Sequence, residues 1–466
     1  MKIPTLFLSA LLILSTGSAV AQNPAAPQAA PYLDLQDGDT LVFLGDSITH
    51  QCLYTQYIED FFYTRYPDRR IRFHNAGVSG DKAADALARF EDDVAAFQPK
   101  YVTVLLGMND GQYEDFTDHI FDTFREDMEQ IGEKILDLNA RPIALSPTMF
   151  DHRQLAHQLK TNPDFRFRNR EFSSQYNALM AFYGAWLREE AGANNVPFVN
   201  LYGPLNDLTE SQRRAAGETG QPFTLVPDAI HPEAAGQFVM AFEFLSQLTP
   251  DRRTVSSISI SKRGKNWRGA SGKTGEITDL VVSDEADSVS FQFQARSLPW
   301  VVPATESEDE KLKWPSPLGA RTGYEMTKAG HKLSNERLKI VGLAAGKYEL
   351  KIDGQSVGTF THAQLGSKIE LQSNEKTPQY QQALEVARLN RERNDTAIRE
   401  VRNKWSRVKG LRRKFNEAGT PDKFETEFEK LKPEIAKLIA LGREYEEKIY
   451  AAAQPKVRRY ELTKVE

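Results

Sequence analysis

The chain has 466 residues, of which 40% are hydrophobic and 26% charged, and its 59 Lys and Arg against 64 Asp and Glu give a formal net charge of -5. This length is too great for one ordinary hydrophobic core, so two or three structural units are expected. The absence of a basic excess argues against nucleic acid as a partner.

The first residues have the pattern of an export signal. Lys2 is followed by an apolar run over residues 6–14 and by small residues at 19–21. Residues 1–21 are therefore predicted to be a signal peptide that is cleaved after Ala21, and the Ala- and Pro-rich residues 22–37 to be a linker. The alternative is that the apolar run belongs to a buried core segment.

The rest of the chain shows no membrane span and no disulfide. No other stretch approaches the roughly 18 apolar residues that a span requires. Cys52 is the only cysteine, so it has no partner within the chain, and no cysteine follows the signal to carry a lipid. We expect an exported protein, periplasmic or secreted, without a stable membrane span.

Residues 38–250 alternate short apolar runs with amphipathic stretches, which is typical of a parallel sheet covered by helices. The runs are LVFLG, IRFHNAG, YVTVLLG, RPIALSP and VPFVNLY. Each run ends in residues suited to loops, and the loops at the carboxyl ends of parallel strands are where such folds place their chemistry.

Residues 251–375 show strand-like alternation without intervening helices, in VSSISIS, ITDLVVS, SVSFQFQAR, ERLKIVGL and KYELKIDG. This pattern predicts a small β-rich unit. The pair Asp353-Gly354 predicts a short hairpin turn, and the segment from Pro303 to Leu333, which mixes Pro, Gly and charged residues, is predicted to be a loop.

Residues 376–466 are predicted to form a helical hairpin and a tail. Apolar residues recur at helical intervals in two stretches, and Gly419 between them suits the end of the first helix. The spaced residues are Ile398, Val401, Trp405, Val408 and Phe415, then Phe424, Phe428, Leu431, Ile435, Leu438 and Tyr445. The hairpin is expected to pack on the body of the protein or on a second subunit, which leaves a homo-oligomer through these helices open.

A candidate nucleophile lies directly after the first apolar run. Ser47, in Gly45-Asp46-Ser47-Ile48, is predicted to stand at the carboxyl end of a strand and before a helix. Such a turn exposes the side chain and leaves the first amides of the helix free to face an anion. A Gly-Asp-Ser triplet alone is more often an ordinary turn or helix cap.

Three further blocks follow in the same unit. NAGVSGD occupies residues 75–81 after the second strand, Gly107-Met108-Asn109-Asp110 follows the third, and Asp228-Ala229-Ile230-His231-Pro232 supplies an acid and an imidazole three residues apart. With these blocks, residues 38–248 resemble the SGNH/GDSL hydrolase family, whose four blocks carry a serine, a glycine, an asparagine and a DxxH pair in this order. The resemblance implies a flavodoxin-like three-layer α/β/α domain.

The resemblance also implies a role for each matching residue. Ser47 would be the nucleophile, His231 its general base and Asp228 the residue that orients the imidazole. The backbone amides of Ser47 and Gly80 and the side-chain amide of Asn109 would form the oxyanion hole. The other histidines, His74, His119, His152, His157, His331 and His362, show no paired spacing with Cys or carboxylates that would suggest a metal site, so we expect no metal and no cofactor.

Other residues near these blocks have a structural role as their simpler explanation. Asp46, Asp110 and Asn75 are expected to hold loops by hydrogen bonds. Gly77 is an alternative to Gly80 as oxyanion donor, and His50 could face the cleft, although packing is the expected role of its side chain.

The substrate is less well determined by the sequence than the reaction. The segment from Ser146 to Tyr176 mixes Arg, His, Asn and Phe and is expected near the cleft, where such a mixture suits a hydroxyl-rich ligand. We expect a serine esterase that removes small O-acyl groups, in particular O-acetyl groups, from a carbohydrate. The alternatives are a short-chain lipase or lysophospholipase-type acylhydrolase, and a non-catalytic glycan-binding or scaffold protein.

Overall fold

The computed structural model describes residues 33–162, 174–217, 222–249, 254–302 and 318–465. The predicted signal peptide and residues 22–32 of the predicted linker lie outside these ranges. Residues 33–37, which were also predicted to belong to the linker, instead pack on the first unit. Leu35 is buried in its core, and the Leu33 amide donates to the Leu248 carbonyl at 3.1 Å. The hydrolase-like unit therefore begins before residue 38.

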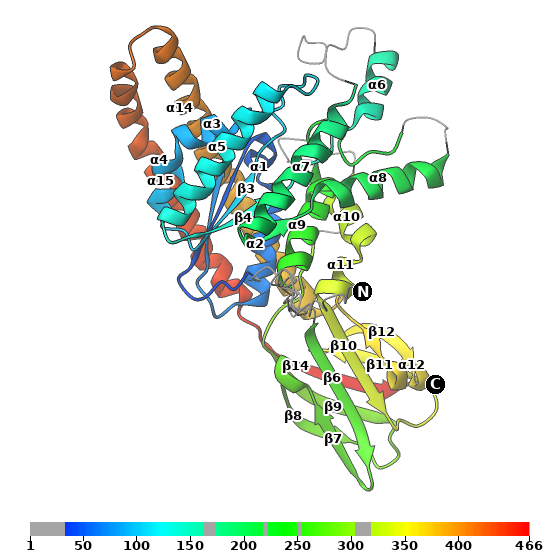
Figure 1. Cartoon of the computed structure of the whole chain (residues 1–466). Helices are drawn as coiled ribbons and strands as arrows, with labels where there is room; N and C mark the ends of the chain where they lie inside the picture. Colours follow the sequence, from blue (N-terminus) through cyan, green and yellow to red (C-terminus); the bar gives the residue numbers. More distant parts are fainter. Residues whose placement is uncertain (1–32, 163–173, 218–221, 250–253, 303–317, 466) are drawn as a thin grey trace, which may run out of the picture.

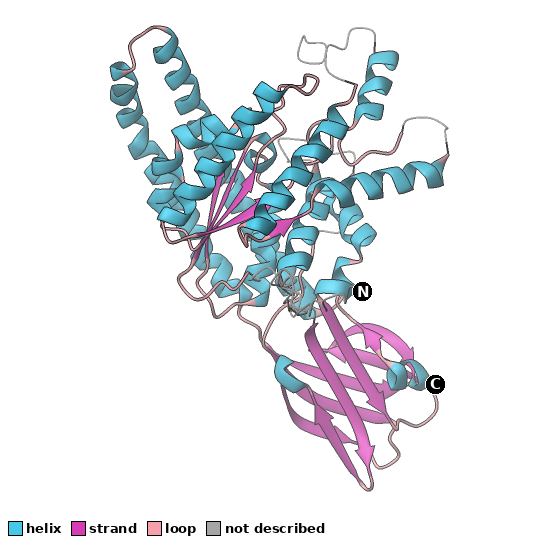
Figure 2. Ribbon diagram, viewed as in Figure 1, coloured by secondary structure: helices cyan, strands magenta, loops and turns pink. Residues whose placement is uncertain are grey.

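The first unit is a five-stranded parallel sheet in the order β2-β1-β3-β4-β5, covered by helices on both faces (Figures 1 and 2). This is the flavodoxin-like three-layer fold that the resemblance implied. The strands are β1 (Thr40–Gly45), β2 (Arg72–Gly77), β3 (Tyr101–Leu105), β4 (Arg141–Leu145) and β5 (Phe198–Val199). The helices are α1 (Ser47–His50), α2 (Leu53–Arg65), α3 (Ala83–Ala88), α4 (Phe90–Asp93), η1 (Ala95–Phe97), α5 (Asp118–Asp137), α6 (His152–Thr161), α7 (Tyr176–Ala193), α8 (Tyr202–Ala216) and α9 (Ala234–Leu248).

Alternation along β1 explains why helices cover both faces of the sheet. Leu41 and Phe43 point into one apolar core, with α2 and α9, and Val42 and Leu44 point into the other, with α3, α5 and α7. All four side chains are fully buried. A strand that is apolar on both faces can be buried only between two helical layers.

The second unit is a sandwich of two sheets, in the orders β13-β10-β6-β7 and β12-β11-β14-β9-β8. Its elements are β6 (Thr254–Arg263), β7 (Asn266–Ala270), η2 (Gly272–Thr274), β8 (Gly275–Val282), β9 (Ser288–Ala295), β10 (Asn335–Val341), β11 (Lys347–Ile352), β12 (Gln355–Thr361), α12 (His362–Ser367), β13 (Ile369–Glu370) and β14 (Val457–Lys464). Asp353 and Gly354 both have positive φ, as the predicted hairpin turn requires.

Two features of the chain after residue 250 differ from the sequence-based expectation. The segment predicted to be a loop up to Leu333 contains α10 (Ala320–Thr327) and α11 (Ala329–Leu333), because Gly323 lets α10 approach the backbone of α9 closely. The tail of the chain is not an appendage of the hairpin. It forms β14, which pairs with β9 and β11 in the middle of the second sheet.

The third unit is the helical hairpin, made of α13 (Pro378–Arg393), the π-helical turn η4 (Asn394–Ile398), α14 (Arg399–Glu417) and α15 (Asp422–Ala453). Gly419 has φ +65° at the turn between the two arms, as predicted. Residues from both arms, including Trp405 and Phe428, form a shared core. Figure 1 shows that the hairpin lies along the hydrolase-like unit, with α14 beside α3.

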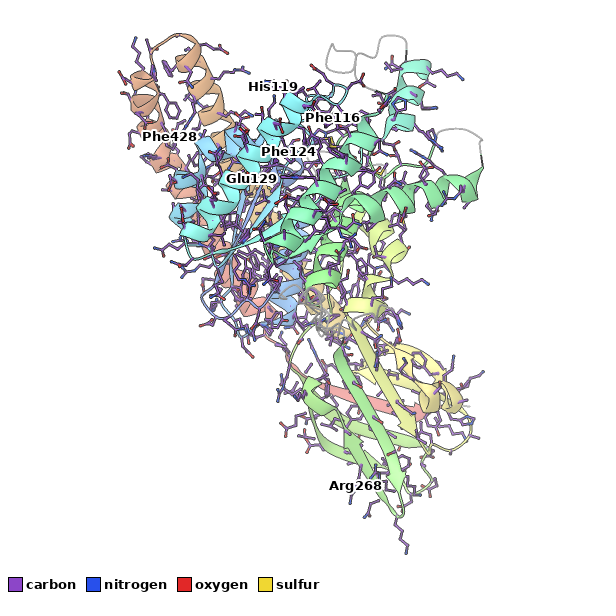
Figure 3. All side chains as sticks on the ribbon, in the orientation of Figure 1. Phe116, His119, Phe124, Glu129, Arg268 and Phe428 are labelled. Carbon is purple, nitrogen blue, oxygen red and sulfur yellow. The ribbon has the colours of Figure 1, made fainter. Side chains whose placement is uncertain are left out.

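The β sandwich lies at the end of the molecule opposite to the carboxyl ends of the parallel strands. The end of α2 holds it there, because the Thr64 carbonyl accepts from the Leu298 amide at 2.9 Å and the Arg65 guanidinium donates to the Leu333 carbonyl at 2.6 Å. Arg268, on β7, and Phe428, on α15, are found at opposite ends of the molecule in Figure 3. None of the residues that line the pocket at Ser47 belongs to the sandwich, so the sandwich does not border the predicted active site.

Candidate active site

Ser47 is the first residue of α1 and directly follows the turn after β1. The Asp46 carboxylate caps this helix by accepting from the Ile48 amide at 2.9 Å. Gly45 permits the sharp turn, because a Cβ there would lie 2.9 Å from the Leu105 carbonyl and closer still to Thr49. The Ser47 amide belongs to the first turn of a helix, where amides have no acceptor within the helix.

The DxxH block brings an imidazole to this serine. His231 Nε2 lies 2.8 Å from Ser47 Oγ, and His231 Nδ1 lies 2.6 Å from Asp228 Oδ2. Asp228 Oδ1 accepts from the backbone amides of Ile230 and His231, and Ala229 between them has φ +72°. With Nδ1–H donating to Asp228, Nε2 is free to accept the proton of the serine hydroxyl, which is the arrangement that general-base catalysis needs.

The charge of Asp228 is stabilised by hydrogen bonds. Partial burial would raise the pKa of its carboxyl, but the hydrogen bonds from the His231 side chain and from the His231 and Ile230 amides outweigh this effect and lower the pKa. The Asp228 side chain is 51% exposed and that of His231 20% exposed. Water therefore also solvates the Asp228 carboxylate, while the hydrogen bonds fix the orientation of its side chain.

Two further carboxyls, those of Asp46 and Asp110, are buried. Burial raises the pKa of Asp46 to about 7, with Asp110 and Asp81 adding to the rise and His231 opposing it. Burial also raises the pKa of Asp110 to about 6.

Gly80 occupies an exposed turn beside Ser47. The Asp81 amide donates to the Val78 carbonyl at 3.1 Å, and Gly80 has φ +74° at the third position of this turn, which favours glycine. Both Gly80 and Ser79 line the same pocket as Ser47 and His231. The position predicted for the glycine oxyanion donor thus borders the pocket.

Asn109 lies near the serine but is buried. Its side-chain amide is 3.1 Å from the Asp81 carbonyl and 3.3 Å from Asp46 Oδ2, and its Oδ1 accepts from the Tyr113 hydroxyl at 3.1 Å. Asn109 is not among the residues that line the pocket at Ser47. Its role as an oxyanion donor stays a prediction that this geometry does not by itself support.

The residues expected to hold loops do so. Asp110 accepts from the Ala83 amide at 2.7 Å and from the Gly107 amide at 2.8 Å. Asn75 donates to the Thr49 carbonyl at 2.7 Å and accepts from the Gly77 amide at 2.9 Å. Because the Gly77 amide is used in this way, Gly77 is the weaker of the two glycine candidates for the oxyanion hole.

Several residues around the site were not predicted from the sequence. Arg89 donates to the Gly45 and Ala76 carbonyls and to Asp81, so it joins the ends of β1 and β2 to the turn at Gly80. Lys409, on α14, pairs with Asp81 at 2.9 Å. No spacing in the sequence identifies Lys409, because it lies more than 300 residues away from its partner.

The pocket at the triad is small. Its volume is about 180 Å³, and its lining consists of Ser47, His50, Gln51, Ser79, Gly80, Asp228, His231 and Glu233. Pockets for drug-sized ligands measure about 300–1,000 Å³. The space therefore suits a small acyl group better than a long chain.

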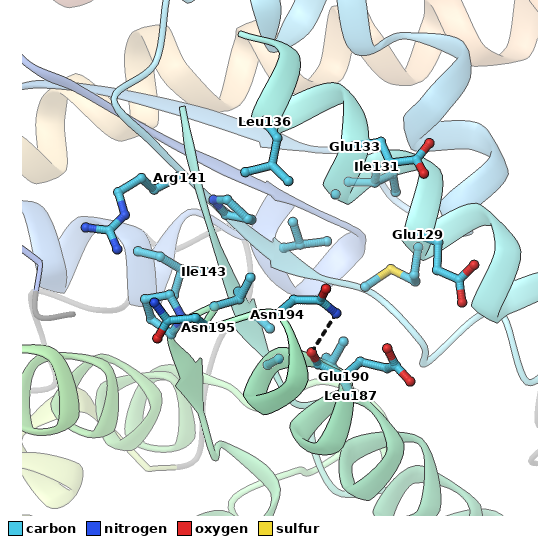
Figure 4. Close-up of a pocket in the computed structure, with 18 of the residues that line it drawn as sticks. Glu129, Ile131, Glu133, Leu136, Arg141, Ile143, Leu187, Glu190, Asn194 and Asn195 are labelled. Atoms are coloured by element: carbon cyan, nitrogen blue, oxygen red, sulfur yellow. Dashed lines mark hydrogen bonds between the residues drawn. The ribbon is translucent and has the colours of Figure 1, made fainter. Parts of the chain in front are cut away.

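A larger pocket, of about 540 Å³, lies elsewhere (Figure 4). It is lined by residues of α5, β4 and the end of α7, among them Leu136, Ile143 and Leu187. It shares no lining residue with the triad pocket. Of these two pockets, the smaller is the candidate active site because Ser47 and His231, which lie at hydrogen-bond distance from each other, line it.

The segment expected near the cleft is described only in part, since residues 163–173 lie outside the described ranges. Gln154 and Gln158 on α6 donate to the Pro227 carbonyl, and the Asp151 amide donates to the Ala229 carbonyl. This places α6 beside the DxxH loop. Within the described residues, no group of three or more His, Cys, Asp or Glu could hold a metal ion, and no helix is long and apolar enough to cross a membrane.

Comparisons with known proteins agree with the geometry. The model of the GDSL-like lipase/acylhydrolase family matches residues 43–238. The chain is 26% identical over 234 residues to an acetylxylan esterase of Geobacillus stearothermophilus, an alignment that covers 46% of this chain and 96% of the relative.

Two solved structures resemble the fold. A gut microbial diltiazem-metabolizing enzyme superimposes with a TM-score of 0.75 and 24% identity, over 94% of this chain and all of the other. A structure of the acetylxylan esterase from Geobacillus stearothermophilus gives a TM-score of 0.37 and 24% identity over 47% of this chain and 97% of the other, which is too low to support an argument. The first superposition shows that the architecture as a whole recurs in another protein.

Proposed function

Because residues 43–238 are a GDSL-like acylhydrolase domain and the chain is an ester-bond hydrolase, we propose that it removes O-acetyl groups from a carbohydrate by serine catalysis. The observation that carries the proposal is the alignment of Ser47 Oγ, His231 and Asp228 at hydrogen-bond distances beside a pocket of about 180 Å³.

The catalytic cycle has two halves. In the first, His231 Nε2 takes the Ser47 proton while Oγ bonds to the acyl carbon, and the oxyanion that forms is held by the Ser47 and Gly80 amides, with Asn109 as the predicted third donor. The imidazolium then protonates the departing alcohol, which leaves an acyl-enzyme. In the second half, His231 removes a proton from water, the hydroxide attacks the acyl carbon, and Ser47 is released with its proton restored.

The size of the pocket supports a short acyl group. An acetyl group fits the volume beside Ser47, whereas a long chain would have to extend over exposed residues such as Ser79. The polar lining, with Gln51 and Glu233, offers hydrogen-bond partners to hydroxyl groups of the alcohol part. The acetylxylan esterase similarity supports a carbohydrate as that alcohol.

The sandwich gives no support for substrate binding at the cleft, because all residues that line the triad pocket belong to the first unit. Export remains part of the proposal on the strength of the N-terminal pattern, which lies outside the described residues.

The test compares acetate release from acetylated xylan by the wild-type protein and by Ser47→Ala. Loss of the nucleophile should lower turnover by about 10⁶-fold, which leaves only the residual rate that substrate binding and the oxyanion hole provide. The matched control is Ser211→Ala on α8, an exposed serine whose hydroxyl only donates to the Leu208 carbonyl; this variant should keep full activity. Wild-type protein that hydrolyses p-nitrophenyl acetate but releases no acetate from glycans would contradict the carbohydrate proposal alone.

A series of p-nitrophenyl esters from acetate to octanoate distinguishes the alternatives. We expect kcat/KM to fall with chain length, since the pocket is small. A preference for octanoate would favour the lipase or lysophospholipase alternative. No turnover of any ester, together with retention on a polysaccharide, would favour the non-catalytic binding protein.

A further inference from the structure

We propose that α14 of the C-terminal hairpin is part of the catalytic apparatus, and that Lys409 on this helix is a positioning residue for the turn Ser79-Gly80-Asp81. The proposal rests on the role of Gly80 as an oxyanion donor in the proposed function, and it does not depend on which ester is the substrate. The hairpin follows the acylhydrolase domain by more than 100 residues and lies outside the family match.

The turn needs outside support to keep its shape. Ser79 and Gly80 are exposed, and one backbone hydrogen bond, from the Asp81 amide to the Val78 carbonyl, closes the turn. Glycine adds conformational freedom at the position whose amide must point at the oxyanion. An oxyanion donor is effective only if it is held in place before the charge develops.

Lys409 provides the first contact with the turn. Its Nζ lies 2.9 Å from Asp81 Oδ1 and 3.0 Å from Asp85 Oδ2, at the start of α3. The other oxygen of Asp81 is held by Arg89 at 2.8 Å. Asp81 is 1% exposed and Lys409 28%, so this ion pair is far better shielded from water than an ordinary surface pair.

Two further contacts join α14 to the same turn from its other side. His50 Nδ1 lies 3.3 Å from both the amide and the hydroxyl of Ser79, and His50 Nε2 lies 3.3 Å from Asn403 Oδ1. Val78, which begins the turn, is fully buried in the core of the hairpin together with Trp405. Contacts with α14 thus lie on both sides of Gly80.

The helix is itself fixed to the acylhydrolase domain. Arg402, fully buried and seven residues before Lys409, makes a bidentate ion pair with Asp93 at 2.7 and 2.8 Å. Residues seven apart lie on the same face of a helix. Lys409 therefore extends from a helix that cannot slide along the domain without breaking a buried ion pair.

The charges around Asp81 make the coupling testable by pH. Burial raises the pKa of the Asp81 carboxyl, Arg89 and Lys409 oppose the rise, and Asp85 adds to it; Asp46 also faces this group from the start of α1. Without Lys409 the pKa of Asp81 must rise further, so Asp81 becomes protonated and loosens its contacts at a higher pH. The acid limb of the kcat profile should move to higher pH.

The experiment measures p-nitrophenyl acetate hydrolysis by Lys409→Met across pH, with the melting temperature of each variant. We expect kcat to fall by about ten- to a hundredfold with KM nearly unchanged. The acid limb of the profile of kcat against pH should move to higher pH. Lys409→Arg should restore most of kcat and the original limb, since it keeps the charge. The matched control is Lys404→Met, on the same helix, because Lys404 pairs only with Glu434 of the other arm; it should leave both quantities unchanged.

A second pair of variants tests whether Lys409 acts through the turn. Asp81→Asn should lower kcat at least as much, and adding Lys409→Met to it should lower kcat no further. Wild-type kcat in Lys409→Met, an equal loss in Lys404→Met, or independent losses in the double variant would each overturn the proposal. An inactive wild-type protein would instead contradict the proposed function.

Discussion

The buried ion pair between Arg402 and Asp93 gives the most decisive test of how the hairpin is attached. Both side chains are 0% exposed, and the pair joins α14 to α4. Asp93 also accepts from Arg89 at 2.7 Å and lies 2.9 Å from His74 Nε2. Burial alone would raise the pKa of Asp93, but Arg402, His74 and Arg89 hold it well below the ordinary value.

Arg402→Met keeps the apolar stem of the side chain and removes the charge. Breaking one partner of a buried pair costs about 3–5 kcal/mol, because the other charge stays buried without full compensation. In the variant Asp93 still has its contacts with Arg89 and His74. We therefore expect a loss of unfolding free energy at the lower end of this range, about 3 kcal/mol at pH 8.

The loss of unfolding free energy in Arg402→Met should be smaller at mildly acidic pH. In the wild type, burial and the charge of Arg402 lower the pKa of His74 to about 4, although Asp93 opposes this. Without Arg402 the native-state pKa values of His74 and Asp93 both rise, so the folded variant binds protons that the folded wild type does not. By linkage, the difference in unfolding free energy between the two proteins decreases as the pH falls.

The assay is urea unfolding followed by tryptophan fluorescence at pH 8 and pH 5.5. Arg70→Met is the matched control, because Arg70 likewise joins the first unit to the hairpin, through α15, but it pairs with Glu447 at an exposed site and lies over the Tyr450 ring; its loss should cost about 1 kcal/mol. Equal losses for the two variants, or a loss in Arg402→Met that is constant with pH, would refute the argument.

Three other predictions concern packing, chemistry and charge. Gly77→Ala should destabilise the protein by at least about 3 kcal/mol, measured by urea unfolding, since the new Cβ would lie 2.4 Å from the His50 backbone nitrogen; a loss below 1 kcal/mol would contradict this. Asp228→Asn should lower kcat for p-nitrophenyl acetate by about 10³-fold, somewhat less than for a fully buried orienting aspartate, and activity within tenfold of wild type would argue against the orienting role. Burial raises the pKa of Glu336 from 4.5 to about 7, with hydrogen bonds from Gln379 and Ser256 opposing the rise, so the folded state loses stability as the pH rises through this range. Glu336→Gln should therefore gain about 3 kcal/mol of unfolding free energy at pH 8 and nothing near pH 4; equal effects at both pH values would count against it.

Local patterns in the sequence predicted the first unit well. Each apolar run of residues 38–250 forms a strand of the sheet, because a strand buried on both faces must be apolar throughout and must be bounded by loop residues. The blocks around Ser47 and His231 also converge, since loops at the carboxyl ends of parallel strands meet at one edge of the sheet. Asp110 and Asn75 hold loops as expected.

Expectations that depended on distant contacts were less successful. The helix α10 lies in a segment rich in Gly and Pro, and its stability comes from packing against α9 rather than from its own residues. The last strand, β14, has no pattern that shows where it pairs, and its partners β9 and β11 were synthesised more than 100 residues earlier.

The sequence by itself predicted the strands and the helical periodicity, because these depend on residue types at short spacing. The resemblance of its four blocks to the SGNH/GDSL family supplied the candidates Ser47, His231 and Asp228, which lie at hydrogen-bond distance from one another in the structure. Only the tertiary structure decided that the sandwich lies away from the cleft, that Asn109 is buried, and that Lys409 reaches the turn at Gly80. Such contacts depend on where whole units dock, and docking is fixed by shape and buried charge summed over many residues rather than by any local pattern.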